Sequence, residues 1–214
     1  MERIFLIDGN SLANRAFYAL PFLTNLKGDP SGAVYGFANL LIKLITDEKP
    51  DDVIVAFDHA RKTFRNEIYA DYKGTRKPTP PELISQFPVI KEMLNKMQIT
   101  TIESAGIEAD DIIGTLSRSM PGKKKYIISG DRDLLQLIDS ETEVWLTRKG
   151  LTDLQKLTNE NMYEEMGFYP KQVIDMKSLM GDTSDNIPGV PGIGEKTALK
   201  LIDTYASLEN LYKN

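Results

Sequence analysis

The stretch Arg3-Ile4-Phe5-Leu6-Ile7-Asp8 decides the fold prediction. Its apolar part, Arg3–Ile7, has the length and composition of a buried strand, and it ends directly in an acid. Val53–Phe57 repeats this arrangement, because Asp58 follows it at once. Further strands are predicted where similar short apolar runs recur, at Ile99–Ile102, Tyr126–Ile128 and Val144–Leu146.

Helical patterns separate these apolar runs. They cover Leu12–Ala19, Ala33–Thr46, Pro81–Met97, Glu108–Ser119 and Asp133–Ile138. The alternation of strands with helices predicts an α/β fold, with a mostly parallel central sheet flanked by helices. Functional sites in such sheets lie outside the carboxyl ends of the strands. Reactive side chains are therefore expected directly after the predicted strands.

The strand patterns stop after about residue 155. The remaining residues show only short helical patterns, at Asn159–Met166, Lys171–Met180, Glu195–Thr204 and Ser207–Tyr212. We expect an α/β core over residues 1–155 and a helical region over residues 156–214.

The composition excludes several classes of site. The chain has 214 residues, 41% of them hydrophobic and 27% charged, which is typical of a globular protein. It contains no cysteine and one histidine, so disulfides, cysteine-ligated zinc and thiol nucleophiles are excluded. The N-terminal stretch lacks a signal-peptide pattern, and no apolar run reaches the length of a membrane span. We expect a cytoplasmic location.

The charge is distributed unevenly along the chain. The net charge is −5, yet residues 61–77 hold six Lys or Arg against two acids, a local charge of +4 that leaves −9 elsewhere. A basic segment of this kind is typical either of a solvated helix or of a contact with nucleic acid. The composition alone leaves both interpretations open.

Acidic residues gather where the fold would place a site. Asp8 and Asp58 end two strands, Asp131 and Asp133 follow a third across Ser129-Gly130, and further acids open the helix at 108 or lie in the stretch 181–186. Any one of them could instead cap a helix. If they converge, their charges need compensation. With only oxygen donors available, Mg²⁺ or Mn²⁺ fits better than Zn²⁺, and two such ions can hydrolyse a phosphodiester.

A glycine-rich stretch lies between two predicted helices, at Gly189-Val190-Pro191-Gly192-Ile193-Gly194-Glu195-Lys196-Thr197-Ala198. Glycines let a backbone approach phosphates, and the following helix N-terminus presents free N–H groups. Glu195 separates the last glycine from Lys-Thr and a helix precedes the stretch, which argues against a P-loop. A helix-hairpin-helix over about residues 171–205 that grips a DNA backbone is favoured over a plain helical corner.

These motifs, in their order, resemble the 5′-nuclease (flap endonuclease) family. The resemblance is carried by Leu6-Ile7-Asp8-Gly9-Asn10, Ala56-Phe57-Asp58, Tyr72-Lys73-Gly74-Thr75-Arg76, Glu108-Ala109-Asp110-Asp111, Ser129-Gly130-Asp131-Arg132-Asp133-Leu134 and Gly181–Gly194. It covers nearly the whole chain. It is strongest toward the 5′→3′ exonuclease domains at the N-terminus of bacterial DNA polymerase I.

The resemblance implies a fold, an activity and a set of site residues. It implies a PIN-like 5′-nuclease fold and metal-dependent hydrolysis of DNA near a 5′ end, nick or flap. Lys73 and Arg76 would reach the scissile phosphate from a helical arch over about residues 61–97. The first metal would be served by Asp8, Asp58, Glu108, Asp110 and Asp111, and the second by Asp131, Asp133, Asp182 and Asp185. DNA contacts are expected at Arg15, Tyr72, Gly189, Gly192, Gly194 and Lys196.

The resemblance also implies partners. A K⁺ ion would bind the hairpin. The chain would be either a part of a longer protein with a polymerase region or a short stand-alone nuclease, and the sequence leaves both open. We expect a monomer.

Two other functions stay open from the sequence. A haloacid-dehalogenase-like phosphatase also uses an acid after its first strand and a late acidic motif, loosely matched by Asp8 and by Gly181–Asp185. It needs a second Asp two residues after the first, where this chain has Asn10. A non-catalytic DNA-binding module would use the hairpin alone, which leaves the nine acids unexplained.

Overall fold

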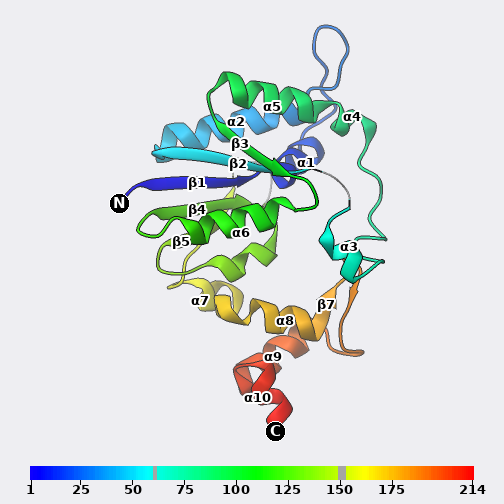
Figure 1. The fold of residues 1–214 in the computed structure, drawn as a ribbon, viewed down its shortest axis with the longest axis vertical. Helices are drawn as coiled ribbons and strands as arrows, with labels where there is room; N and C mark the ends of the chain where they lie inside the picture. Colours follow the sequence, from blue (N-terminus) through cyan, green and yellow to red (C-terminus); the bar gives the residue numbers. More distant parts are fainter. Residues whose placement is uncertain (60–61, 149–152) are drawn as a thin grey trace.

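The computed structural model describes residues 1–59, 62–148 and 153–214 (Figure 1). At its centre lies a six-stranded sheet in the order β3-β2-β1-β4-β5-β6, whose first five strands are parallel while β6 runs antiparallel to β5. The strands are β1 Arg3–Asp8, β2 Asp52–Asp58, β3 Thr100–Ser104, β4 Lys124–Ser129, β5 Thr142–Thr147 and β6 Leu154–Leu157. The predicted α/β class with a mostly parallel sheet is confirmed.

The strand order reverses between β1 and β4. The chain adds β2 and β3 on one side of β1, and β4 and β5 on the other. Ile7 of β1 pairs with Ile128 of β4, so the residues that follow these strands leave the sheet side by side. An open α/β sheet forms its crevice at such a reversal, beyond the carboxyl ends of the strands. The fold therefore brings Asp8 next to the loop that carries Asp131.

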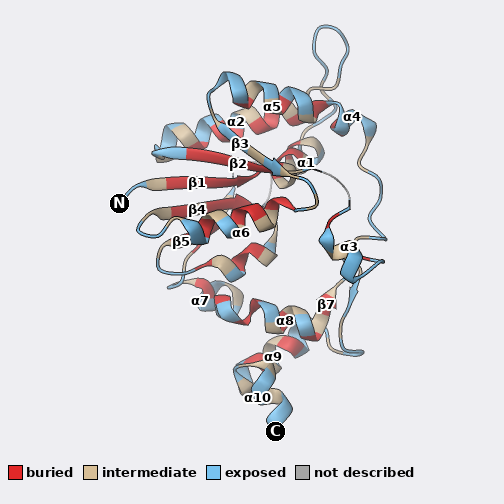
Figure 2. Cartoon of the chain, in the orientation of Figure 1, coloured by how far each residue is buried: buried red, intermediate tan, exposed pale blue. Residues whose placement is uncertain are grey.

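Alternate side chains of β1 are buried in two separate hydrophobic cores. Phe5 and Ile7 pack under α1 Gly9–Ala19, α2 Gly32–Glu48 and α5 Gln86–Lys96, whereas Ile4 and Leu6 pack on the side of α6 Ala109–Ser119. The alternation follows from strand geometry, in which successive side chains point to opposite faces. Burial on both faces explains why these strands are continuously apolar (Figure 2).

Helices dominate the C-terminal part, as predicted. They are the 3₁₀ helix η2 Pro170–Gln172 and the α-helices α7 Met162–Met166, α8 Val173–Met180, α9 Glu195–Tyr205 and α10 Leu208–Lys213. A further 3₁₀ helix, η1 Arg132–Leu137, lies between β4 and β5 in the α/β part. Two very short strands, β7 Gly181–Asp182 and β8 Ile187–Pro188, pair between α8 and α9. Ala198 and Ile202 of α9 are buried in the same core as α6, so this region packs directly on the α/β part.

Some predicted elements differ in detail. The strand β6 was not predicted, because its four residues Leu-Gln-Lys-Leu lack a run of apolar side chains. The single helix expected over Pro81–Met97 is two helices, α4 Pro81–Ile84 and α5. Pro88 has no N–H to donate to the carbonyl of Ile84, which interrupts a continuous helix. The helix expected at Asp133–Ile138 is the 3₁₀ helix η1.

The arch expected over about residues 61–97 is helical only in part. Arg61 lies outside the described residues. The segment contains α3 Phe64–Ile68, then turns to residue 75 and an extended stretch before α4. Its last part, α5, packs on the sheet through the fully buried Ile90 and Leu94. Only the part before α4 stands apart from the sheet (Figure 1).

Within the described ranges, no helix is both long and apolar enough to cross a membrane.

Candidate active site

The carboxylate of Asp8 joins the ends of β1 and β4. One oxygen accepts a hydrogen bond of 2.7 Å from the Ser129 hydroxyl, and the other accepts one of 2.9 Å from the Ser11 N–H, capping α1. Ser129 Oγ in turn accepts the N–H of Asp131 at 3.0 Å. Hydrogen bonds through Ser129 thus connect Asp8 to Asp131 across the point where the strand order reverses.

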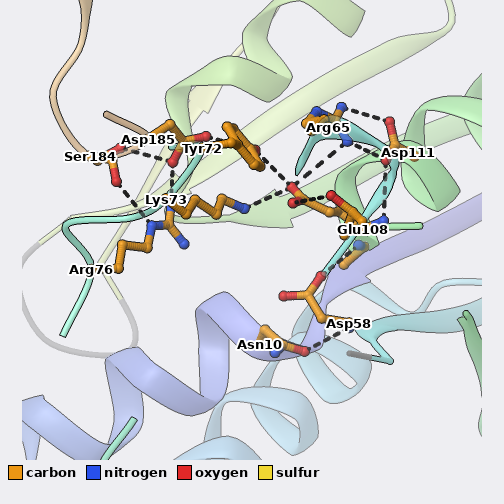
Figure 3. A network of polar contacts seen from close by, with 12 residues as sticks. Asn10, Asp58, Arg65, Tyr72, Lys73, Arg76, Glu108, Asp111, Ser184 and Asp185 are labelled. Atoms are coloured by element: carbon orange, nitrogen blue, oxygen red, sulfur yellow. Dashed lines mark hydrogen bonds and ion pairs between the residues drawn. The ribbon is translucent and has the colours of Figure 1, made fainter. Parts of the chain in front are cut away.

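Asp58 links neighbouring elements in a similar way at the end of β2. Its Oδ1 accepts a 2.8 Å hydrogen bond from the N–H of Ala109, the first residue of α6. Its own N–H donates to Asn10 Oδ1 at 3.0 Å (Figure 3). The start of α1, the end of β2 and the start of α6 are therefore held together, and α6 places Asp110 beside them.

Four of these acids repel one another. Burial raises the pKa of Asp110 to about 8, with further contributions from the charges of Asp8, Asp131 and Asp58. Burial likewise raises the pKa of Asp8 to about 6, against the hydrogen bonds from Ser11 and Ser129. The charges of Asp58 and Asp131 act on both Asp8 and Asp110, so these four residues lie near one another. We call these four residues the acidic cluster.

Two cations of the basic segment lie at the edge of this cluster. Lys73 Nζ is 2.7 Å from Glu108 Oε2, and Arg76 Nη2 is 2.5 Å from Asp185 Oδ1. The buried Tyr72 links both acids, because its hydroxyl lies 3.1 Å from Glu108 Oε2 and 2.9 Å from Asp185 Oδ2 (Figure 3). The segment that precedes α4 therefore bridges α6 and the loop after α8.

A third acid of α6 is paired with an arginine. Asp111 accepts two hydrogen bonds from Arg65, at 2.7 and 2.8 Å, and these bonds lower the pKa of the carboxyl. The same carboxylate accepts the N–H of Glu108 at 3.2 Å, which caps α6.

Lys177 of α8 holds the acids on the other side of the site. Its ammonium lies 2.7 Å from Asp133 Oδ1 and 2.6 Å from Asp182 Oδ2. Burial opposes ionisation of Asp182, yet the hydrogen bonds from Lys177 and Ser184 keep its pKa at about 2. Burial raises the pKa of Asp133, which Lys177 counteracts. One lysine thus stabilises two of the acids expected at the second metal.

A cleft of about 780 Å³ opens beside these residues, between α3, α6 and α8. Asp110, Asp133, Lys177, Asp182 and Asp185 line it. In the described part of the chain, no three acidic side chains form a complete cradle for one ion. The nine expected acids are instead divided between the acidic cluster and four groups neutralised by Lys73, Arg65, Arg76 and Lys177. The donors are all oxygens and the cluster has unbalanced charge, so the residues fit a hard divalent cation.

The glycines of the hairpin have two different roles. A Cβ at Gly189 would lie 2.2 Å from the carbonyl carbon of Met180, so this glycine allows two backbones to pack and is not a free phosphate contact. Gly192, at φ +83°, and Gly194 have open space around the Cα. Gly194 begins α9, and Lys196 lies exposed in its first turn. The surface available to a ligand is therefore Gly192 to Lys196.

The other expected DNA contacts also differ. Arg15 lies partly exposed on α1. Tyr72 is 7% exposed and its hydroxyl is engaged inside the protein, which contradicts an exposed stacking platform for a base. Four residues of the site were not predicted as site residues, namely Asn10, Arg65, Ser129 and Lys177. A basic residue five positions before Asp182 was the available signal for Lys177.

Comparison with known proteins identifies the family of this chain. Residues 3–167 match the family described as "5'-3' exonuclease, N-terminal resolvase-like domain". The chain belongs to the 5′-3′ exonuclease family. Residues 168–214 match its C-terminal SAM fold. Membership identifies the chain as a nuclease, a phosphodiester hydrolase, and favours this class over the phosphatase and the non-catalytic alternative.

Relatives within this 5′-3′ exonuclease family are found in bacteria. DNA polymerase I of Bacillus subtilis is 52% identical over 215 residues, covering 100% of this chain and 24% of that protein. DNA polymerase I of Bacillus caldotenax is 50% identical over 212 residues, covering 98% of this chain and 24% of that protein. The chain thus spans about a quarter of the length of the curated relatives it matches.

Solved structures share the fold at low sequence identity. The bacteriophage T5 flap endonuclease, in a complex with DNA and metal ions, matches with a TM-score of 0.78 at 24% identity, covering 100% of this chain and 79% of that one. The catalytic core of Rad2 with a DNA substrate matches with a TM-score of 0.60 at 18% identity, covering 98% and 63%. At such identities the likeness shows the fold.

Proposed function

We propose that this chain is a structure-specific 5′ nuclease that hydrolyses DNA phosphodiesters near 5′ ends and flaps with divalent metal ions. The observation that supports it best is the acidic cluster. Four carboxylates from β1, β2, α6 and the loop after β4 lie near one another beyond the ends of the strands, with the Lys73 ammonium beside them. Their mutual repulsion in one space has no structural benefit, and a bound cation would offset it.

The cluster would hold the first ion through Asp8, Asp58 and Asp110, with Glu108 nearby. Asp131 would contribute between the two ions, because its charge raises the pKa of both Asp110 and Asp133. Asp133, Asp182 and Asp185 would hold the second. Mg²⁺ or Mn²⁺ bound there would activate a water molecule and stabilise the leaving oxygen.

The chain's own cations complete the site. Lys73 and Arg76 now neutralise Glu108 and Asp185. A phosphate entering the cleft would compete for these same side chains, so they would exchange an internal acid for the scissile phosphate. Gly192, Gly194 and Lys196 would contact the duplex backbone without reading bases.

The substrate class is supported by the relatives. The T5 flap endonuclease and the catalytic core of Rad2, which share the fold, are solved with DNA, and the bacterial relatives are DNA polymerase I. We include in this proposal a polymerase region in the parent chain, a monomeric state, a K⁺ ion at the hairpin and the cytoplasmic location expected from the sequence. The division into a core over 1–155 and a helical region over 156–214 also stays a proposal.

A substrate comparison tests the function. The chain is mixed with a 5′-labelled flap duplex, with a blunt duplex of the same sequence and with a small phosphate monoester, each with Mg²⁺ and with EDTA. We expect cleavage of the flap near its junction in Mg²⁺ alone, with slower cleavage of the blunt duplex. Hydrolysis of the monoester without cleavage of either DNA would contradict the proposal.

A further inference from the structure

Arg65 and Lys73 both lie against the ring of Tyr72. The guanidinium of Arg65 lies 6.0 Å from the centre of the Tyr72 ring, and the Lys73 ammonium lies 5.0 Å from the same centre. The Tyr72 hydroxyl and Lys73 Nζ both contact Glu108 Oε2. The ring is 7% exposed, so its position is set by these neighbours. A shift of Arg65 would therefore move the ring on which Lys73 rests.

Arg65 is itself held firmly. Its two parallel hydrogen bonds to Asp111 fix the guanidinium in plane, which a single point charge would not do. Its side chain also packs over the Phe64 ring at 4.8 Å. Asp111 also accepts the N–H of Glu108, the residue that Lys73 contacts. Arg65, Asp111, Glu108, Tyr72 and Lys73 thus form one connected group (Figure 3).

Lys73 needs such support because of its backbone. It adopts φ +55°, in the left-handed region that residues other than glycine seldom occupy. Its N–H donates to the carbonyl of Asp185 at 2.9 Å, which secures one side. The group around Arg65 secures the other. A strained residue at a candidate site keeps its conformation only when its surroundings hold it in place.

We propose that Arg65 is a positioning residue of the nuclease, which with Asp111 sets the place of the Lys73 ammonium through the Tyr72 ring, and that Asp111 serves this pair and not a metal ion. The inference rests on the proposed function. It reassigns Asp111, which the family resemblance had implied as a ligand of the first metal.

A double-mutant cycle tests whether Arg65 positions Lys73. Arg65→Gln is expected to lower the saturating single-turnover rate on the 5′-flap duplex about tenfold, while DNA affinity changes less than about twofold, because misplacement of a catalytic group affects chemistry more than binding. In the Lys73→Ala background, Arg65→Gln should lower the single-turnover rate by less than about twofold, because the ammonium that Arg65 positions is absent. Equal losses in both backgrounds would overturn the proposal, and so would a loss confined to affinity.

Two variants control for folding and charge. Lys96→Gln removes an exposed cation from α5, outside the cleft, and should cleave like wild type. Arg65→Lys keeps the charge without the two-pronged contact and should give an intermediate rate. If Arg65→Gln does not fold, the cycle is run with Arg65→Lys, where equal losses in both backgrounds would again overturn the proposal.

Thermal melts test whether Asp111 binds a metal ion, without measuring cleavage. Mg²⁺ should raise the melting temperature of Asp111→Asn as much as that of wild type, and raise that of Asp110→Asn clearly less. Loss of the Mg²⁺ effect in Asp111→Asn would make Asp111 a metal ligand and overturn the reassignment. If wild type itself fails to cleave the flap, the proposed function fails, and these melts still decide the role of Asp111.

Discussion

Ser129, at the end of β4, donates a hydrogen bond of 2.7 Å to the carboxylate of Asp8, at the end of β1. Ser129 is fully buried, and its hydroxyl also accepts the N–H of Asp131. This contact crosses the point where the strand order reverses, so it ties two acids of the cluster to one neutral side chain. A buried carboxylate needs such donors to remain ionised.

Ser129→Ala should lower the free energy of unfolding by about 1–3 kcal/mol, because it removes a donor to a charged, buried acceptor. Denaturant unfolding measures the change. Ser178→Ala is the matched control, since that hydroxyl donates to a backbone carbonyl on the exposed side of α8. Equal stability of the two variants would show that the Asp8 contact contributes little.

Lys73→Ala should reduce the single-turnover rate of flap cleavage more than it weakens DNA binding. The expected reason is loss of charge stabilisation at the phosphate as the bond breaks. Lys196→Ala should show the reverse, with weaker binding and a shallower dependence of affinity on salt. Rate and affinity measured over a salt series separate the two, and an unchanged salt slope for Lys196→Ala would argue against a phosphate contact there.

Without metal, substitutions of two acids should change the melting temperature in opposite directions. Asp110→Asn relieves repulsion in the cluster, so it should melt higher than wild type in EDTA. Asp182→Asn breaks the ion pair with Lys177 and should melt lower. Mg²⁺ should stabilise wild type by about 2.7 kcal/mol at a hundredfold excess over Kd, and Asp110→Asn by less. If Asp110→Asn melts below wild type in EDTA, the cluster is not under electrostatic strain.

The hairpin glycines should respond differently to an added methyl group. Gly189→Ala would place a Cβ 2.2 Å from the Met180 backbone, so it should lower the melting temperature and displace the loop that carries Asp182 and Asp185. Gly194→Ala meets open space and should melt within about 0.5 kcal/mol of wild type, while crowding the backbone surface offered to DNA. Normal stability of Gly189→Ala would contradict this packing role.

The sequence predicted much of this site and missed a specific part of it. Asp8, Asp58 and Asp131 could be placed at one sheet edge because each follows an apolar run, and parallel strands end on the same side. Which cation neutralises which acid could not be predicted, since Lys177 meets Asp133 only through the packing of α8 beside η1. Tyr72 was expected as a DNA contact, and its burial with the hydroxyl between Glu108 and Asp185 depends on contacts between segments far apart in the sequence.

The short elements were missed for a related reason. The edge strand β6 is specified by pairing with β5, from Val144–Leu157 to Thr147–Leu154, and its own residues carry no strand pattern. The paired residues of β7 and β8 are held by the approach of Gly181 to Gly189. Such tertiary contacts override local propensity, so they became visible only in the folded chain.

The most direct measurement is cleavage of a 5′-flap duplex by Asp131→Asn in Mg²⁺, with DNA binding measured on the same preparation. The charge of Asp131 raises the pKa of both Asp110 and Asp133, which we propose serve different metal ions, and Asn keeps the size of Asp131 while removing its charge. We predict that most turnover is lost, by at least about a hundredfold, while binding stays within a few-fold of wild type. Cleavage at the wild-type rate would remove Asp131 from the reaction and contradict a metal-dependent mechanism built on the acidic cluster.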